Sequence, residues 1–583
     1  MKNENCYLFI RRSFSAGGLS VFLLLTTLLF SACSHKERAD KLFFGGTIYT
    51  VDLTNSKVEC VVVKDGKIIF TGTKKEADEK YAVDSSIDLH GKFMYPGFID
   101  AHCHFYGYAM DMKKVDLYGT KSWEEVLQKV NSFVDGKKNT KQEFKKGEWI
   151  LGRGWDQNDW EKKEFPDNEE LNKMFPDNPV FLVRVDGHAA ITNQKALTIA
   201  GIKPLDKIAG GSIEITLKGG YFATHENIYD SKPMKVRLSG ILIDNAMELV
   251  RKNIPEWNDE EKTKLLQQAQ ENCFAVGLTT ISDAGLTKEN IFLLDTLQKQ
   301  GKIKMRTYCM VADSAESKTY FFEHGVYKTD FMHVCAMKFY ADGALGSRGA
   351  CLLKPYSDDA TNFGFLLSSQ NYFEQQAKLC FEKGFQMCTH CIGDSANRFM
   401  LNLYAKILGG KNNRRWRNEH CQVVNENDFH FFGDYNIVPS VQPCFATSDM
   451  PWAEKRIGAD RMSGAYAWQK MLKQCGYVSC GSDFPVESIN PLYGFYAAIT
   501  RKDHDGNPKE GFQMQDALSR IEALRGMTIW AAFADFEEKE KGSIEVGKFA
   551  DFTILDEDIM TAPEENLWNI KVLQTWIGGE KVY

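Results

Sequence analysis

The stretch PGFIDAHCHF, residues 96–105, places two histidines on either side of a cysteine directly after an apolar run. In a β-strand, alternate side chains point to the same face, so His102 and His104 point together and Cys103 points away. Two imidazoles on one face suit a shared metal ion, but they also suit a strand that reaches the surface with two polar residues. The rest of the chain has to decide between these interpretations.

Seven further apolar or β-branched runs follow this stretch, and helical patterns separate most of them. The runs are 276–285, 305–313, 335–343, 385–390, 416–422, 437–443 and 477–483. Strands that alternate with helices predict an α/β fold with a parallel sheet, and eight β/α units predict a TIM (β/α)8 barrel. The active site of such a barrel is built where the strands end.

Ionisable residues gather at or near the ends of the predicted strands. They are His102, His104, Lys338, His390, His420 and Asp483. The chain has only 12 histidines, and chance placement would scatter them rather than bring four to the strand ends. Imidazoles and a carboxylate that converge at a barrel mouth are typical of a divalent-metal site.

The motifs that carry these residues resemble the amidohydrolase superfamily. They are PGFIDAHCHF, MKFYADGALGSRGA, THCIGDSAN, EHCQVV, SVQP and GSDFPV. More closely, they resemble its branch of predicted metal-dependent hydrolases that includes N-substituted formamide deformylase, amidohydrolase family 3. The likeness runs in order from about residue 42 to the C-terminus, and GRGWDQNDW (152–160) and RVDGHAAITN (184–193) share it.

The resemblance implies a set of metal ligands. His102 and His104 would hold one ion and His390 and His420 a second, with two zinc ions expected and a single zinc or iron as the alternative. An ammonium group has no lone pair for a metal, but Lys338 carboxylated by carbon dioxide would bridge two ions. The alternative is that Lys338 forms a structural ion pair with Asp342 or another carboxylate.

The same resemblance gives Asp483 two roles, as a metal ligand and as the proton carrier in catalysis. A metal-activated hydroxide would attack a carbonyl, and Asp483 would pass the proton to the leaving amine. Hydrolysis of an amide, N-acyl or N-formyl C–N bond of a small molecule is therefore the expected reaction. The alternative role for Asp483 is a helix N-cap, because SDFP fits a cap before a proline.

A long insertion, roughly residues 105–270, follows the first predicted strand, and we expect it to cover the pocket. Within it, Trp155 and Gln157 are candidate pocket residues and His188 is a candidate substrate contact from a lid. Arg348, in GSRGA after the fourth strand, is a candidate for orienting a substrate carbonyl or anionic group. Trp155, Gln157 and Arg348 could instead stabilise the long loops, and the alternative for His188 is a structural role.

The flanking segments predict a second, discontinuous domain. Residues 41–95 and 540–583 alternate apolar and polar positions around glycine turns, as hairpin strands do. The resemblance implies that both segments form a small β-sandwich beside a barrel spanning residues 96–500.

The N-terminus, residues 1–33, resembles a bacterial lipoprotein signal peptide. Lys2, Arg11 and Arg12 precede the apolar stretch 19–30, which is too short to span a bilayer, and SAC follows it. Cleavage before Cys33 would leave that cysteine lipidated, and the protein would be anchored in the bacterial cell envelope through the lipid alone. The alternative is an uncleaved buried helix.

The composition of the chain disfavours some partners and some classes of fold. A net charge of −7, with no run of lysine or arginine, disfavours a nucleic-acid partner. The cysteines are scattered singly in apolar runs, so most are expected to be buried free thiols. A non-catalytic envelope lipoprotein that binds a small molecule, and an esterase or phosphoester hydrolase on the same metal site, remain alternatives. A homodimer is compatible with all of these.

Overall fold

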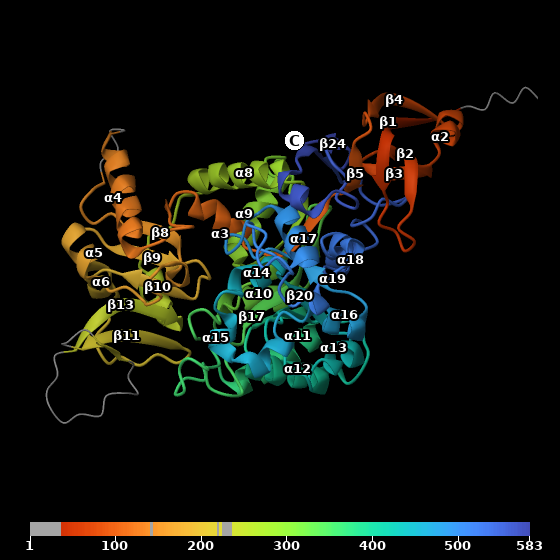
Figure 1. The fold of residues 1–583 in the computed structure, drawn as a ribbon. Helices are drawn as coiled ribbons and strands as arrows, with labels where there is room; N and C mark the ends of the chain where they lie inside the picture. Colours follow the sequence, from red (N-terminus) through yellow and green to blue (C-terminus); the bar gives the residue numbers. More distant parts are fainter. Residues whose placement is uncertain (1–35, 140–143, 218–220, 224–235) are drawn as a thin grey trace, which may run out of the picture.

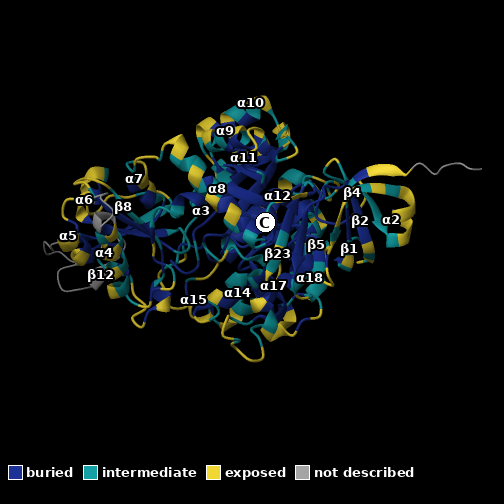
Figure 2. Ribbon diagram, turned by 90° about the horizontal axis from the view of Figure 1, so that it is seen from above, coloured by how far each residue is buried: buried dark blue, intermediate teal, exposed yellow. Residues whose placement is uncertain are grey.

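The computed structural model describes residues 36–139, 144–217, 221–223 and 236–583. Within these residues the strands form three sheets, which are the barrel, a sheet within the insertion and a sheet built from both terminal segments. Figure 1 shows the barrel in the middle, with the insertion on one side and the terminal sheet on the other. The view from above in Figure 2 shows the same arrangement and places the buried strands at its centre.

The barrel is a sheet of eight parallel strands in the order β6, β14, β15, β17, β18, β19, β20, β21, with the short β16 (Tyr327–Lys328) pairing antiparallel to β17. Their bounds are β6 Phe98–Cys103, β14 Leu278–Leu286, β15 Arg306–Val311, β17 Met332–Tyr340, β18 Gln386–Cys391, β19 Arg417–His420, β20 Val438–Val441 and β21 Ser479–Cys480. Backbone hydrogen bonds from Asp483 to His102 (2.7 Å) and from His104 to Phe484 (2.8 Å) link the last strand to the first. The sequence prediction of eight strands in a nearly closed α/β barrel is confirmed.

Helices between the strands cover the barrel. They include α8 Asp259–Ala275, α9 Lys288–Lys299, α10 Ala315–His324, α11 Gln370–Lys383, α12 Asp394–Leu408, α13 His430–Tyr435, α16 Trp468–Cys475 and α17 Pro491–Thr500. Polar side chains cap several of them; Thr287, for example, accepts the backbone N–H of Asn290 at the start of α9. The cysteines of the described residues are all free and mostly buried, as predicted.

The insertion forms a sheet of its own that the sequence analysis did not predict. Its strand order is β12, β11, β13, β10, β9, β8, β7. The bounds are β7 Val115–Asp116, β8 Ile150–Trp155, β9 Val180–Arg184, β10 Ala189–Thr192, β11 Gly211–Leu217, β12 Tyr221–Ala223 and β13 Val236–Asp244. Alternate residues of β9 enter different apolar clusters, with Leu182 on one face and Phe181 on the other. Helix α4 (Trp123–Asn139) covers the first face and α6 (Gln194–Ala200) the second.

The two terminal segments meet in one eight-stranded sheet. Its order is β24, β23, β22, β5, β1, β2, β3, with β4 paired to β1. The bounds are β1 Glu37–Tyr49, β2 Lys57–Lys64, β3 Lys67–Gly72, β4 Tyr81–Asp88, β5 Phe93–Pro96, β22 Phe552–Leu555, β23 Val572–Ile577 and β24 Glu580–Lys581. Strand β22 runs antiparallel to β5, so the predicted meeting of the termini is observed. The layering of this sheet as a sandwich stays a prediction.

The predicted signal peptide and Cys33 lie outside the described residues. Within the described part of the chain, no helix is both long and apolar enough to cross a membrane. The lipid anchor therefore stays a prediction.

Candidate active site

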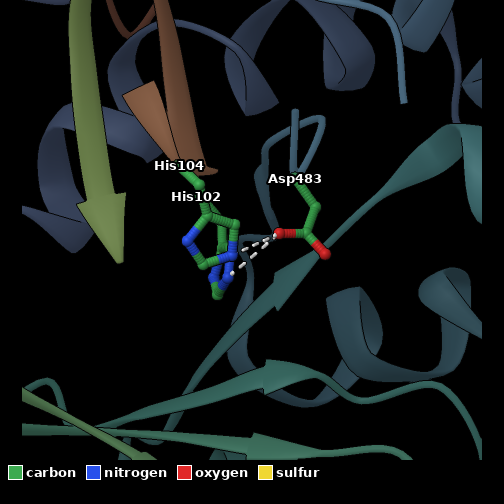
Figure 3. A group of neighbouring side chains, drawn as sticks. All are labelled: His102, His104 and Asp483. Carbon is green, nitrogen blue, oxygen red and sulfur yellow. Dashed lines mark ion pairs between the residues drawn. The ribbon is translucent and has the colours of Figure 1, made fainter. Parts of the chain in front are cut away.

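A histidine pair and a carboxylate converge where the barrel closes. His102 lies on β6, His104 follows it, and Asp483 follows β21, so the first and last strands supply the group. The Nε2 atoms of His102 and His104 lie 3.6 and 3.1 Å from Asp483 Oδ1, as the dashed lines in Figure 3 mark. One ligating atom from each residue lies within 4.8 Å of the others, which is close enough for one ion.

The other predicted ligands lie beside this group. The ring of His420 lies 4.7 Å from that of His102 and 4.6 Å from that of His390, measured between centroids. Lys338 Nζ lies 3.2 Å from His102 Nε2. The structure therefore brings all six residues that the sequence suggested as metal ligands into one cluster at the barrel mouth.

Buried partners orient two of the imidazoles. Glu419 Oε2 lies 2.5 Å from His102 Nδ1, and Gln442 Oε1 lies 2.7 Å from His420 Nδ1. An acceptor at Nδ1 places the ring proton there and leaves the Nε2 lone pair free for a metal. The sequence analysis missed both partners, although Glu419 directly precedes His420 in the EHCQVV motif.

Burial and neighbouring charges keep the imidazoles neutral. Burial, together with the Lys338 charge, lowers the pKa of His102 to about 4, and burial lowers the pKa values of His390 and His420 well below the usual value. Burial raises the pKa of Glu419. Arg417, whose Nε lies 2.7 Å away, and His102 lower it by more, so the pKa of Glu419 lies far below its ordinary value. Neutral imidazole is the form that binds a metal.

Lys338 is a buried amine without a carboxylate partner. Burial lowers the pKa of Lys338, and none of the ion pairs found in the described residues involves it. The sequence alternative of an ion pair with Asp342 is wrong, because that carboxylate instead accepts the backbone N–H groups of Cys351, Ile392 and Gly393. The neutral amine is the form that combines with carbon dioxide, and burial shifts Lys338 in that direction, so its surroundings fit a carbamate.

Asp483 is held in place by the residue before it. Ser482 donates from its hydroxyl to Asp100 Oδ2 (2.6 Å) and from its backbone to Asp100 Oδ1 (3.0 Å). Asp483 itself has φ 61°, a left-handed conformation that non-glycine residues adopt at some energetic cost and that recurs at functional sites. The N-cap alternative is wrong, because the next helix, α17, begins only at Pro491.

The donor set fits a divalent metal. His390 Nε2 is buried without a hydrogen-bond partner among the described residues, and Asp342 Oδ1 lies 3.8 Å from it. Asp483 Oδ1 likewise has only its ion pairs with His102 and His104. Burial raises the pKa of Asp483. The hydrogen bond with His104 and the charges of His102, His104 and His420 lower it by more, so the pKa of Asp483 lies far below its usual range. Buried imidazole nitrogens that converge with a carboxylate are what a metal such as zinc binds.

A cavity of about 260 Å³ lies over this cluster, between the barrel loops and the insertion. His188, predicted as a substrate contact, lines it, and its ring lies 4.9 Å from that of His390. His188 Nδ1 lies 2.6 Å from Asp244 Oδ1, so a buried carboxylate of the insertion fixes the ring. The insertion therefore contributes directly to the wall of the cavity, as its position in the sequence suggested.

The other three predicted substrate residues are not among those that line this cavity. Trp155 is fully buried in the insertion, and its Nε1 donates to Leu182 O at 2.9 Å. Gln157 Oε1 accepts from Arg184 Nε at 2.8 Å, and Arg348 pairs with Asp358 at 3.0 Å. Their direct contact with substrate stays a prediction, and their placement favours a role in positioning the loops.

Comparison with known proteins identifies the family. A family model described as "Amidohydrolase family" matches residues 86–583. The chain belongs to the amidohydrolase family. YtcJ of Bacillus subtilis (strain 168) is 30% identical over 93% of this amidohydrolase and 99% of YtcJ. N-substituted formamide deformylase of Arthrobacter pascens is 26% identical over 93% of this chain and 98% of the deformylase.

A solved structure supports the same assignment. The uncharacterised metal-dependent hydrolase from Pyrococcus horikoshii OT3 superposes with a TM-score of 0.70 and 26% identity, over 90% of this amidohydrolase and 99% of that chain. Together with the family, this likeness makes the protein a metal-dependent hydrolase that uses a divalent metal.

Sequence reasoning about this amidohydrolase also missed Arg184, which lines the cavity although its side chain is almost fully buried. Arg184 lies between Asp156 and Asp186, each 2.5 Å from a guanidinium nitrogen. A polar pattern within the GRGWDQNDW and RVDGHAAITN motifs was visible, but which of these side chains face one another depends on the pairing of β8 with β9.

Proposed function

We propose that this amidohydrolase hydrolyses a C–N bond, in an amide, N-acyl or N-formyl group, of a small molecule. The cluster of oriented histidines, Lys338 and Asp483 at the floor of a cavity is the observation that carries the proposal. The similarity to N-substituted formamide deformylase along nearly the whole chain supports this bond type. A non-catalytic binding protein has no need for ligand nitrogens oriented by buried partners, so that alternative is not favoured.

The residues that would hold the metal are those of the cluster. In this proposal His102, His104 and Asp483 would hold one ion, His390 and His420 would hold a second, and a carboxylated Lys338 would supply a further anionic ligand. Divalent ions bound there would polarise the scissile carbonyl and lower the pKa of water towards ~7. Zinc is the ion that the nitrogen-rich donor set favours.

Asp483 moves the proton in the proposed reaction. Water oxygen bonds to the carbonyl carbon, the C–N bond breaks, and the nitrogen departs as an amine only if it gains a proton. The Asp483 carboxylate accepts that proton from the attacking water and delivers it to the leaving nitrogen. The products are a carboxylic acid, or formate, and an amine.

His188 orients the substrate in this proposal. Burial lowers its pKa, but the hydrogen bond and charge of Asp244 more than offset this, so the pKa of His188 is raised. With Nδ1 held by Asp244, a protonated ring donates from Nε2 to an oxygen in the cavity. The substrate carbonyl is the acceptor we assign to it.

We also propose that the mature protein is lipid-anchored at Cys33 in a bacterial cell envelope and acts there on small molecules. The basic, apolar and small-residue pattern of residues 1–33 supports this placement.

The test is a substrate screen with zinc-loaded protein. A panel of N-formyl and N-acyl amines, and the esters of the same acids, is incubated with the protein, and released amine or alcohol is measured. We expect amine release that is lost after chelation and in Asp483→Asn. Cleavage of the esters alone would establish the esterase alternative instead, and turnover of neither class would overturn the proposed C–N bond specificity of this site.

A further inference from the structure

Three glycines of the loop after β17 lie against charged side chains of the insertion. They are Gly343, Gly346 and Gly349, in the DGALGSRGA part of the motif. A methyl group added at Gly349 would lie 2.6 Å from Asp244 Oδ2, and one added at Gly343 would overlap the same oxygen. A methyl group added at Gly346 would lie 3.0 Å from Arg184 Nη2. None of the three glycines has a left-handed backbone, so the close approach of the insertion, rather than a turn, accounts for the missing side chains.

The two outer glycines form a notch around the carboxylate of Asp244. The backbone N–H of Gly343 donates to the carbonyl oxygen of Gly349 at 3.3 Å, so the two residues face each other across the loop. Asp342, which directly precedes the notch, accepts the backbone N–H of Ile392 at 3.0 Å and so fastens the loop to the end of β18. The barrel therefore holds this glycine notch, Gly343 with Gly349, in a fixed place.

Asp244 links the glycine notch to His188. Its Oδ1 lies 2.6 Å from His188 Nδ1, and its Oδ2, which enters the notch, is buried without a hydrogen-bond partner among the described residues. Buried carboxylate oxygens rarely lack such a partner. Asp244 also has φ 51° and ψ −124°, a conformation that is costly for a residue other than glycine and that recurs at functional sites. A strained, buried carboxylate thus joins the barrel loop to an imidazole of the insertion.

This link reaches the catalytic cavity. His188 lines the cavity, and so do Ala344 and Leu345 from the loop between the two notch glycines. The ring of His188 lies 4.9 Å from that of His390, and its orientation depends on where Asp244 holds Nδ1. A displaced carboxylate would therefore turn the His188 ring within the cavity.

We propose that Gly343 and Gly349 are positioning residues, which seat Asp244 and thereby hold His188 towards the substrate carbonyl. In this view His188 is oriented only when the insertion is docked on the glycine notch, so the active site is completed by the contact between the two parts of the chain. The inference rests on the proposed role of His188 in C–N hydrolysis and adds the residues that hold that histidine in place.

The experiment fills the notch with a methyl group. Gly343→Ala and Gly349→Ala are compared with Gly136→Ala, at an exposed glycine of α4 where the methyl group meets no described residue outside its own helix within 4 Å. With zinc-loaded protein and the N-formyl or N-acyl amine it cleaves best, we expect kcat/KM to fall by at least about tenfold in each notch variant, because small misplacements of an orienting group cost much of the rate. Gly136→Ala should keep the wild-type value, and zinc content should be equal in all. Wild-type kcat/KM in both notch variants would overturn the inference.

A double-mutant cycle with His188→Ala separates positioning from support of the fold. If the notch acts through His188, Gly343→Ala should change kcat/KM by less than about twofold once residue 188 is alanine, because both changes then remove the same interaction. A loss that persists in full in the His188→Ala background would show that the glycine only supports the fold, and the inference would be wrong. Thermal melting identifies a variant that fails to fold, and the other notch glycine then decides.

A measurement without turnover separates this inference from the proposed function. In protein with isotope-labelled histidine, the short hydrogen bond of 2.6 Å between His188 Nδ1 and Asp244 gives a downfield proton resonance, assigned by its loss in His188→Ala. The notch variants should shift or remove this resonance, and Gly136→Ala should leave it in place. An unchanged resonance in both notch variants would overturn the inference. If the resonance moves although no compound is cleaved, the positioning of His188 stands and the proposed C–N bond specificity fails.

Discussion

Asp483 reaches the cluster from a left-handed backbone position, φ 61°, next to a serine held by buried Asp100. The amide of Asp483→Asn fills the same volume but cannot carry a proton between water and amine. We expect turnover to fall by at least ~10², the scale of general acid–base catalysis, while the histidines retain metal. Steady-state kinetics with elemental analysis measure both, and near-normal turnover would remove Asp483 from the mechanism.

Lys338 decides how many ions the cluster holds. Two divalent ions bring four positive charges. Without a carbamate, the remaining anions offset too few of these charges, and the two ions would repel each other strongly in a poorly screened interior. We expect two zinc-like ions per chain in the wild type and about one in Lys338→Ala, with partial recovery when a short carboxylic acid is added. One ion in both proteins would make the site mononuclear and the bridge wrong.

Glu419 binds no substrate in our proposal but holds His102 at Nδ1 and balances buried Arg417. Glu419→Gln should lower zinc affinity by about 10–100-fold, the usual effect of losing a carboxylate behind a metal-binding histidine. Competition with a chromogenic chelator measures this. Glu426→Gln, at an exposed ion pair with Lys470, is the matched control, and equal affinities of the two variants would contradict the orienting role.

At the level of elements, the insertion is fastened to the barrel through Arg456 of α15 (Ala453–Ile457). Its guanidinium contacts Asp358 and donates to Asn158 Oδ1 of the insertion at 3.0 Å. Asp358 keeps its pairing with Arg348, but Arg456→Met should leave Asn158 Oδ1 without this donor, at about 1–3 kcal/mol, and loosen the cover over the cavity. Faster limited proteolysis within residues 112–258 and a raised KM are expected, and wild-type cleavage rates would contradict this.

The barrel was predictable because each strand is a local apolar run, and Lys338, His390 and Asp483 follow from their places on those runs. The insertion sheet was not predictable, because β10 pairs with β13 across a long intervening stretch and this pairing leaves no local pattern in the sequence. Gln157 shows the same limit at a side chain, because its motif suggested a pocket residue and only the fold reveals that it turns to Arg184. Partners such as Glu419 depend on such distant contacts too.

At the level of the whole molecule, our proposal is that residues 1–33 direct the enzyme to the cell envelope. If Cys33 is lipidated, Cys33→Ser should release the protein from membranes or leave it unprocessed, while the activity of the folded protein persists. Detergent-phase partitioning and the mass of the mature N-terminus measure this. Unchanged partitioning into the detergent phase would rule the anchor out.

The terminal sheet has a consequence for how the chain is made. Strand β5 pairs with β22, which leaves the ribosome only after the whole barrel has been made. At about 5–20 residues per second, synthesis of the barrel in between takes on the order of tens of seconds, and the edge of β5 waits unpaired for that time. A chain that stops before residue 552 keeps this edge open, and open strand edges promote aggregation. Synthesis of β22 thus closes this edge, and an interrupted chain is expected to aggregate more readily than one that includes β22.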